Sequence, residues 1–227
     1  MSEVGGPGGE MRAGLARYFP PFGLRVVTPR LMLALPTDED LLALVEVTNA
    51  GVHDPASMPF LVPWTDTPAP RRQFDSLTHW WGVRAHWSAT NWNWAAAVYV
   101  DGHPIGVQSV FAHDFAARRQ VGTASWIGLA HQGQGFGQEM RSAALQLAFE
   151  GLGAIMAHSG YLEHNAASRR VSSALGYRAN GTSLEPVRGA LVRQHNVVLE
   201  RDAWEVRRRD DVVIEGLDGC RSYFGVP

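Results

Sequence analysis

The amino-acid sequence predicts a mixed α/β fold in which helices cover both faces of a mostly antiparallel sheet. Two observations support this prediction. Three apolar segments, residues 93–100, 104–112 and 120–127, follow one another as an antiparallel meander, and Asp101-Gly102 between the first two is a strong hairpin signal. A glycine-rich loop, an amphipathic helix and a further strand come next, so the chain continues as a βαβ-like unit.

The segments before this meander alternate between strand, helix and loop. Residues 31–35 are expected to form a strand, and Pro36-Thr37-Asp38 begins a helix that runs toward Asn49, because Thr or Asp can cap its first turn. The stretch from residue 51 to residue 70 carries five prolines and is expected to be an ordered but irregular loop. A second helix should run from about residue 71 to residue 87.

The loop that follows the meander has the composition of an anion site. Gly133, Gly135 and Gly137 carry no Cβ, so successive backbone N–H groups can turn toward one anion. The helix that begins near Phe136 adds the unpaired donors and the positive dipole end of its first turn. A diphosphate can therefore be held here without a lysine or a metal ion.

The helix after this loop has an amphipathic pattern, whereas the loop matches neither of two common phosphate-binding motifs. Polar residues such as Glu139 and Ser142 fall largely outside the apolar stripe. The Walker loop needs a lysine after its glycines, and the dinucleotide-binding loop needs a different glycine spacing. The stripe consists of Phe136, Met140, Ala143, Ala144, Leu147 and Ala148.

The last third of the chain predicts one short helix and further strands. Asn165 can cap the helix, Gly176 can terminate it, and the next residue opens a strand. Residues 181–184 and 187–199 are expected to supply a last strand pair, and residues 201–209 a short terminal helix.

Two motifs in this order resemble the GCN5-related N-acetyltransferase (GNAT) family. Gln132-x-x-Gly135-x-Gly137 is similar to the acetyl-CoA signature Q/R-x-x-G-x-G/A of that family. The segment from Asn165 to Tyr177 is similar to its N-x-x-S-x-x-V-x-x-x-L-G-F/Y segment. Upstream, Thr28 to Leu33 resembles the first strand of the RimJ/RimL-like branch.

The resemblance implies a division of the chain and a particular sheet. Residues 24–200 would form the GNAT acetyltransferase domain, residues 1–23 a flexible or loosely docked segment, and residues 201–227 a C-terminal extension. The two central strands of the family sheet part in a V. Here these would be the strand ending near Ile127 and the strand beginning near Ala154.

The resemblance also implies direct transfer of an acetyl group from acetyl-CoA to a primary amine, either a protein N-terminus or a small molecule. The pantetheine arm would pair with the main chain of Trp126, Ile127 and Leu129 in the gap of the V. Asn165 and Ser168 would lie near the pantetheine and the thiol. The implied diphosphate-binding residues are Gln132, Gly133, Gln134, Gly135, Phe136 and Gly137.

The catalytic groups are less clearly indicated. RimJ/RimL-like relatives commonly place a glutamate on the strand before the loop, but residues 121–126 contain no carboxylate, and the tyrosine that many relatives use as an acid falls at Ser172. This leaves Ser168 or Ser172 as hydroxyls near the sulfur, and Asp114 or Glu163 as proton acceptors acting directly or through water. Each acidic residue also has an ordinary alternative, Asp114 as a turn cap and Glu163 as a solvated loop residue.

Composition disfavours several other classes. The formal net charge of −2 gives no electrostatic footprint for nucleic acid. Cys220 is the only cysteine and no metal-ligand spacing surrounds it, so neither a disulfide nor a metal site is expected. No apolar run is long enough to cross a bilayer, and Met1 to Glu10 does not resemble a secretory signal and is not expected to be ordered. The reducing cytoplasm is the expected compartment.

Three questions stay open at this point. The tryptophans upstream of the loop either form an aromatic acceptor pocket or pack in the core, and we expect Trp81 to be buried and Trp80 to point elsewhere. The extension after residue 200 suggests a homodimer formed by exchange of this arm, a lid, or docking on its own domain. The rival function is a catalytically silent acyl-CoA-binding sensor or interaction module, because the usual glutamate and tyrosine are missing.

Overall fold

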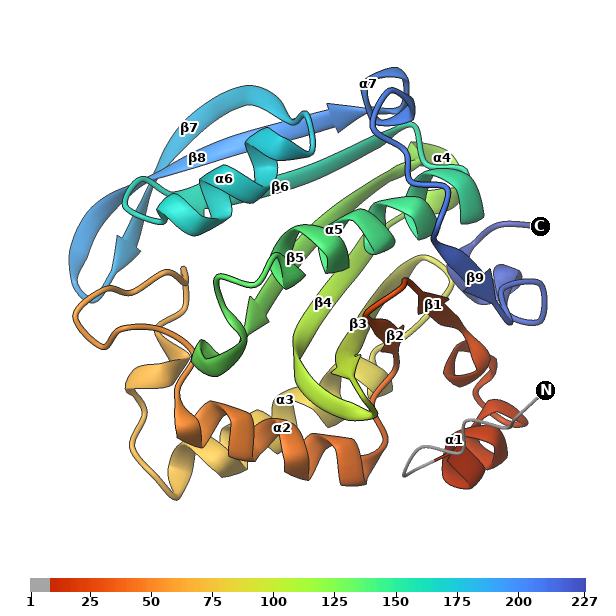
Figure 1. The fold of residues 1–227 in the computed structure, drawn as a ribbon, viewed down its shortest axis with the longest axis horizontal. Coiled ribbons are helices and arrows are strands. Elements are labelled where there is room, and N and C mark those ends of the chain that lie inside the picture. The colour runs from red at the N-terminus through yellow and green to blue at the C-terminus, as the bar shows by residue number, and fades with distance from the viewer. Residues whose placement is uncertain (1–8) are drawn as a thin grey trace.

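A single sheet of nine strands organises the part of the chain that the computed structural model describes, residues 9–227 (Figure 1). The strand order is β7-β8-β6-β5-β4-β3-β2-β1-β9. The strands are β1 (Arg25–Val27), β2 (Met32–Ala34), β3 (Asn91–Val100), β4 (His103–His113), β5 (Gln120–Ile127), β6 (Met156–Leu162), β7 (Arg178–Val187), β8 (Ala190–Glu200) and β9 (Val213–Glu215). The helices are α1 (Gly9–Ala16), α2 (Asp38–Ala50), α3 (Arg71–Ala85), α4 (Phe115–Arg118), α5 (Phe136–Gln146), α6 (Ala166–Ala174) and α7 (Arg201–Glu205).

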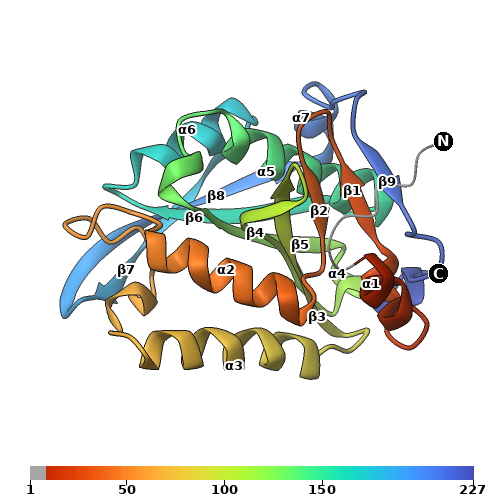
Figure 2. The same cartoon turned by 60° about the horizontal axis from the view of Figure 1, so that its bottom comes forward.

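The predicted fold class is confirmed: the sheet is mixed and mostly antiparallel, and helices cover both of its faces. Helices α5 and α6 lie on one face, and α2 and α3 lie on the other (Figures 1 and 2). No helix within residues 9–227 combines the length and the apolar character needed to cross a membrane. The prediction for the glycine-rich start falls largely on residues 1–8, outside the described part, whereas Gly9 and Glu10 begin α1.

Several local signals in the sequence produce the elements that they predict. Thr37 caps α2 in a reciprocal capping box with Asp40, which satisfies the first orphan N–H groups of that helix. Asp101 and Gly102 both adopt positive φ, at 48° and 79°, and join β3 to β4 as a tight hairpin. Asn165 caps α6 by accepting a hydrogen bond from the Ser168 N–H.

Other boundaries differ from the prediction. The expected breaks near residue 181 and before residue 187 are absent: β7 is one strand with a bulge between Ala179 and Thr182, and the turn to β8 lies at Arg188-Gly189. The terminal helix α7 ends at Glu205 rather than at residue 209.

The expectation for the two neighbouring tryptophans of α3 was wrong. Trp80 packs against the core on the α2 and α3 side of the sheet, whereas Trp81 is 47% exposed. The apolar stripe predicted for α5 is buried as expected, but the polar Glu139 and Ser142 beside it are buried as well, whereas Gln138 is exposed. This helix lies beneath α6 and the C-terminal segment as well as against the sheet, so polar positions are enclosed together with the apolar stripe.

The sheet contains one parallel pair, β5 with β6, and this pair separates early. Only Gln120 to Gly122 of β5 pair with β6, and the last partners are Gly122 and His158. Both strands continue beyond this point, β5 to Ile127 and β6 to Leu162, without pairing with each other. The strands therefore diverge, and α5 and α6 lie in front of the opening (Figure 1).

The C-terminal segment docks on its own domain in this chain. Strand β9 pairs antiparallel with β1 at the edge of the sheet. Further on, Phe224 is fully buried between Trp87 and Trp92, with ring centroids 5.2 and 4.9 Å away, and its carbonyl accepts a hydrogen bond from the Trp92 indole at 3.0 Å. Trp87 and Trp92 thus pack against the C-terminal segment.

We expect Phe224→Ala to lower the free energy of unfolding by about 3–5 kcal/mol, because it removes a fully buried aromatic ring and leaves a cavity between two indoles. Chemical denaturation followed by circular dichroism measures this loss. Val206→Ala is the control, since Val206 is 81% exposed and its truncation should cost less than about 0.5 kcal/mol. Equal stability of Phe224→Ala and the wild type would contradict the docking of this segment.

Candidate functional site

The glycine loop between β5 and α5 presents a row of unused backbone donors. Gly133 and Gly135 have φ of +76° and +84°, a region that favours glycine, and Gly135 stands directly before the first residue of α5. Among residues 9–227, no group accepts a hydrogen bond from the N–H of any residue from 133 to 137. A Cβ built on Gly133 meets no atom within 4 Å, so the loop is open on this side. The arrangement suits an anion with several oxygens.

The side chain of Gln132 bonds to the backbone on both sides of the loop. Its amide nitrogen donates to the carbonyls of Val52 at 2.8 Å and Ile127 at 2.9 Å. Gln132 therefore fastens the end of β5 and the loop after α2 to each other, and it presents no free side-chain donor to an anion. Gln134 likewise bonds back to the Ala130 carbonyl at 3.0 Å.

A buried carboxylate lies beneath the first turn of α5, and sequence analysis did not single it out. Glu139 is 4% exposed, accepts a hydrogen bond from the Thr28 hydroxyl at 2.6 Å, and accepts another from Arg30 Nε at 2.7 Å. Burial raises the pKa of Glu139, but the hydrogen bonds from Thr28 and Arg30 and the charges of Arg30 and Arg209 outweigh it, so the pKa lies below its usual value. A negative charge is thus retained close to the loop.

Arg30 joins this carboxylate to the glycine loop. Its guanidinium lies over the Phe136 ring at 4.7 Å from the centroid and donates to the Gln134 carbonyl at 3.1 Å. Arg30 also approaches within 3.4 Å of a Cβ built on Gly135, and its side chain is 48% exposed. Glu139 orients this cation beside the free amides. The sequence Thr28-Pro29-Arg30 indicated a family-like first strand. Only the contacts with Glu139 and Gln134 show that Arg30 lies beside the glycine loop.

The predicted pantetheine-pairing residues lie at the gap between the diverging strands. Trp126 and Ile127 belong to the part of β5 that pairs with β4 but has no partner on the β6 side. Leu129 follows in a single 3-10 turn, Leu129–His131, and is 43% exposed. The main chain of β5 past Gly122 therefore has one edge without a strand neighbour, which an extended ligand can occupy.

Helix α6 closes the α5 side of this gap. A Cβ built on Gly137 would lie 3.7 Å from Val171, so the two helices approach each other at the start of α5. Ser168 is partly buried, and its N–H is held by the Asn165 cap. Ser172 is 3% exposed, and its hydroxyl has no hydrogen-bond partner among the described residues. An unsatisfied buried hydroxyl here is compatible with a ligand that supplies the missing partner.

The opposite face of the same strands carries His158 and a set of aromatic rings. Because side chains alternate along a strand and Ala157 packs on the α5 side, His158 faces the other side, and so does Trp126. His158 is the last paired residue before β6 diverges, and its Nε2 lies 3.2 Å from Gln120 Oε1. Burial, together with the charge of Arg118, lowers the pKa of His158.

The irregular loop between α2 and α3 encloses this face. Phe60, Trp64 and Trp126 form a chain of rings with centroids 5.3 and 6.0 Å apart. The Met58 carbonyl lies 2.7 Å from His164 Nε2, and the Pro59 carbonyl 3.4 Å from the Asn165 side-chain nitrogen. The loop is thus attached to the start of α6 across the open end of the gap. Of the tryptophans upstream of the glycine loop, Trp64 thus lies in an aromatic wall beside the gap.

The two predicted proton acceptors lie apart from each other. Asp114 is in the β4–α4 turn, where its N–H donates to the Thr90 carbonyl, at the end of the sheet where β5 and β6 are still paired. Glu163 follows β6 at the opposite end and is exposed. The structure brings neither next to His158, which marks the point of divergence.

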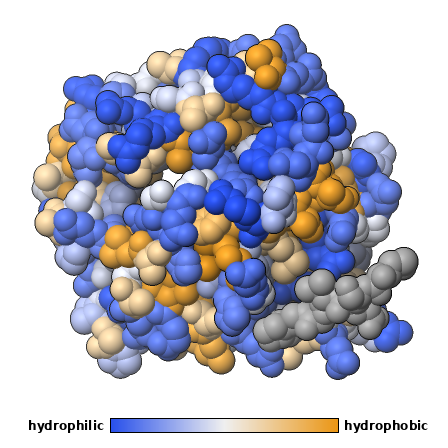
Figure 3. All heavy atoms as spheres, in the orientation of Figure 1, coloured by the Kyte–Doolittle hydropathy of each residue, from blue (hydrophilic) through white to orange (hydrophobic). Residues whose placement is uncertain are grey.

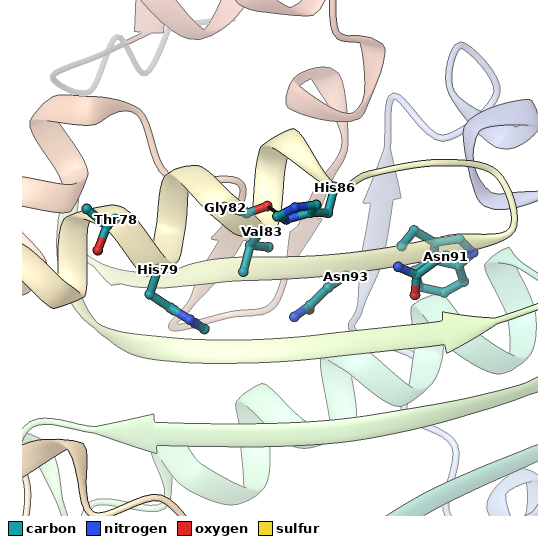
Figure 4. Close-up of a pocket in the computed structure, with 8 residues that line it drawn as sticks. Thr78, His79, Gly82, Val83, His86, Asn91 and Asn93 are labelled. Carbon is teal, nitrogen blue, oxygen red and sulfur yellow. Dashed lines mark hydrogen bonds between the residues drawn. The ribbon is translucent and has the colours of Figure 1, made fainter.

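A pocket of about 390 Å³ opens on the same face as His158, between α3 and β3. Figure 4 shows His79 of α3 and Asn93 of β3 pointing toward this space. The buried Asn93 Oδ1 has no hydrogen-bond partner among residues 9–227. Asn93 pairs with Phe111, Phe111 with Gly122, and Gly122 with His158, so one row of residues connects the pocket to the point of divergence. None of the predicted site residues lines it.

Within the described residues there is no cluster of three or more histidine, cysteine or acidic side chains that could hold a metal ion. Cys220 is buried, and burial raises its pKa to about 11.

The view in Figure 3 shows hydrophobic residues in small groups separated by hydrophilic ones over the face that carries α5 and α6.

Comparisons with known proteins agree with this geometry. A family model described as an acetyltransferase (GNAT) domain matches residues 30–178. Mycobacterium smegmatis RimJ in complex with a CoA disulfide is 17% identical, with a TM-score of 0.67, covering 88% of this chain and 91% of that one. RimL, a ribosomal L7/L12 alpha-N-protein acetyltransferase, in complex with coenzyme A is 16% identical, with a TM-score of 0.64 and coverage of 78% and 97%.

A third similar structure is a spermidine N-acetyltransferase chimera from Vibrio cholerae and hSSAT. It is 17% identical, with a TM-score of 0.61, covering 78% of this chain and 98% of that one. At such low identities, the three structures establish only a shared fold. Membership of the family is shown by the family model, which matches the sequence.

Replacement of Glu139 by glutamine should lower the free energy of unfolding by about 1.5–3 kcal/mol at pH 7, because the charged hydrogen bonds to Thr28 and Arg30 are lost. Since the folded pKa is depressed, this stabilisation is fully present above the ordinary glutamate pKa of 4.5 and is lost as the pH falls through the folded value. Denaturant melts of both proteins from pH 7 down to pH 3 measure the difference.

Glu205→Gln is the matched control, because it removes a carboxylate from an exposed ion pair with Arg201. Its effect should be small at every pH. A stability difference for Glu139→Gln that does not shrink below pH 4.5 would show that the charge of Glu139 is not what the contacts stabilise.

Proposed function

Because the chain belongs to the acetyltransferase (GNAT) family, we propose that it transfers an acetyl group from acetyl-CoA to a primary amine by direct transfer in a ternary complex. The family match over residues 30–178 carries the activity and the acyl donor. The unused amides from Gly133 to Gly137, directly before and within the first turn of α5, support a binding site for the donor diphosphate. Acetyl-CoA brings an activated thioester, so the protein mainly has to position the two substrates.

The donor site that we propose extends from this loop into the gap between β5 and β6. The main-chain edge of Trp126 and Ile127 would pair with the pantetheine arm, next to Leu129. Asn165 holds the first turn of α6 beside it, and Ser168 and Ser172 would lie near the thiol. The orphan hydroxyl of Ser172 and the open space at Gly133 fit this proposal.

We assign the role of proton acceptor to His158 in preference to Asp114 and Glu163. The donor loop lies on the α5 face, so the amine must approach from the other face, where α2 packs on β4 and α3 on β3. His158 is on that face at the point where β5 and β6 diverge. Its lowered pKa keeps the imidazole neutral near pH 7, which is the form that accepts a proton.

The acceptor would lie along the row that leads from His158 over Phe111 to Asn93, with its remainder in the pocket between α3 and β3. Adjacent strands are about 4.8 Å apart, so this row gives a path about 14 Å long. The neighbouring RimL and spermidine acetyltransferases are named for a protein N-terminus and for a polyamine. Either acceptor is long enough to use such a path, and Trp64 and Trp126 provide aromatic faces for a cationic amine. The cytoplasm, where acetyl-CoA is made and used, is the compartment that we propose.

Incubation with acetyl-CoA and a panel of peptides, polyamines and amino acids should release free thiol with at least one acceptor. Replacement of Gly135 by valine should weaken CoA binding at least tenfold and slow turnover, because a β-branched side chain is strained at φ +84° and covers the amides. Calorimetric titration with CoA and a thiol assay measure both effects.

Gly181→Val is the matched control, since Gly181 has a φ of +86° with open space around it and lies in β7, away from the loop. It carries the same backbone strain and should leave CoA affinity unchanged. Tight CoA binding with no thiol release across the panel would favour the silent acyl-CoA sensor. Unchanged affinity in Gly135→Val would contradict the diphosphate site.

His158→Gln should lower kcat/KM by about 10²–10⁴-fold and should remove the acidic limb of the pH profile. In the wild type, activity should fall as the pH decreases through the lowered pKa, below 6.5, because protonated histidine cannot accept the amine proton. Steady-state kinetics between pH 5 and 9 measure this. His103→Gln, in the exposed β3–β4 hairpin, should leave the profile unchanged. An acidic limb that persists in His158→Gln would assign the base to another group.

A further inference from the structure

A buried arginine without a carboxylate partner spans the gap between the diverging strands. Arg141 of α5 is 4% exposed. Its Nη2 donates to Ser125 of β5 at 2.8 Å, its Nη1 to Ser159 of β6 at 3.0 Å, and its Nε to Gln108 of β4 at 3.1 Å. All three acceptors are neutral, and Arg141 forms no ion pair with any residue from 9 to 227.

Such an arrangement is costly for packing alone. A buried charge without a counter-charge loses hydration that neutral hydrogen bonds only partly replace, and an apolar side chain of similar volume would fill the space at lower cost. Among the described arginines, only Arg12 and Arg141 have less than a tenth of their surface exposed, and Arg12 is paired with the carboxylate of Asp40. A negative charge that is absent from the protein itself would complete the environment of Arg141.

The location of Arg141 indicates which charge this is. Ser159 is the first residue of β6 beyond the last pair, Gly122 with His158, and Ser125 lies three residues beyond that pair on β5. The guanidinium therefore forms the α5 side of the gap at the place where the proposed donor ends in its thioester, and this step rests on the proposed function.

The two serines are not equivalent. Ser159 accepts from Arg141, and its own hydroxyl donates to the Thr123 carbonyl at 3.3 Å. Ser125 accepts from Arg141, and its own proton has no acceptor within the described part of the chain. Because the guanidinium occupies the oxygen of Ser125, the free proton points away from Arg141, and Ser125 is only partly buried. Ser125 is therefore able to donate to a ligand in the gap.

We propose that Ser125 donates a hydrogen bond to the negative charge that forms at the thioester, and that Arg141 is the positioning residue that orients Ser125 and strengthens it. During transfer the amine nitrogen bonds to the carbonyl carbon, the C–S bond breaks, its electron pair stays on sulfur, and the amine proton passes to His158. A fixed cation beside the sulfur would stabilise the sulfur anion. The pair would thus take the role of the tyrosine hydroxyl, because Ser172 stands at the motif position of that tyrosine.

The thiol of bound CoA tests this without any acceptor, because the same groups that stabilise the departing sulfur anion stabilise the thiolate of CoA. In the wild type, the pKa of the bound CoA thiol, followed by the ultraviolet absorbance of the thiolate, should lie about one to two units below that of free CoA. Ser125→Ala should remove most of this shift while CoA affinity stays within about threefold. Arg141→Lys should keep part of the shift, since it keeps the charge but not the forked geometry.

Ser159→Ala is the matched control, because it also removes one hydrogen bond to Arg141 but has no free proton to give. It should keep the shift of the CoA thiol. With an acceptor, Ser125→Ala should lower kcat about 10²-fold and leave KM for acetyl-CoA nearly unchanged, whereas Ser159→Ala should change kcat little.

Three results would overturn the proposal. The first is a bound thiol that titrates like free CoA although CoA binds, which leaves the proposed function intact. The second is an equal loss in Ser125→Ala and Ser159→Ala, which would make the network structural. The third is an Arg141→Lys variant that transfers acetyl groups normally but no longer transfers the acyl group of a dicarboxylic acyl-CoA. Arg141 would then bind a carboxylate on the acyl chain instead of orienting Ser125. Failure to bind CoA at all would reject the proposed function together with this inference.

Discussion

The divergence of β5 and β6 is the constraint on which the rest of the structure depends. Two parallel strands that share only the pairs from Gln120 to Gly122 leave main-chain groups unpaired on both sides of a gap. Such groups are costly inside a protein unless something satisfies them. Side chains do so at the narrow end, where Ser159 donates to the Thr123 carbonyl, and in the proposed function the donor substrate would do so farther along. The active-site geometry is a consequence of this incomplete ladder.

The two faces of the gap carry different chemistry because different elements cover them. On one face, α5 begins at a loop of free amides and then places Arg141 under the opening. On the other face, the strands past β4 lie beyond the helices α2 and α3, and the loop between these helices supplies Phe60 and Trp64. In the proposed function, the thioester would be held from one side while the amine approaches from the other, with His158 at the junction.

Features that depend on neighbouring residues were predictable from the sequence. Glycine spacing at Gly133 and Gly135 determines where the backbone turns, Thr37 and Asn165 cap helices, and Asp101-Gly102 makes a hairpin through local conformation alone. Arg141 and Glu139 were not recognisable in this way. Both lie outside the apolar stripe of α5, and contacts with other elements of the fold bury them. Nothing in the local sequence distinguishes His158 from other histidines in strands. Only the structure shows that the pairing of β6 with β5 ends at this residue.

Long-range pairing explains the remaining differences. Strand β9 is only three residues long and closely follows a charged cluster, so its place beside β1 depends on the whole sheet being in place. The same is true of α3, where Trp80 rather than Trp81 packs inward because α2 and the sheet determine which side of the helix is covered.

The bonds of Gln132 have a thermodynamic consequence. Its single amide group holds the Val52 carbonyl, at the start of the aromatic loop, and the Ile127 carbonyl, at the end of β5. Movement of either segment must break one of these bonds or carry the other segment with it. If binding in the gap moved one of these segments, the bonds of Gln132 would pass that movement to the other segment, and any coupling between two ligands would then be reciprocal.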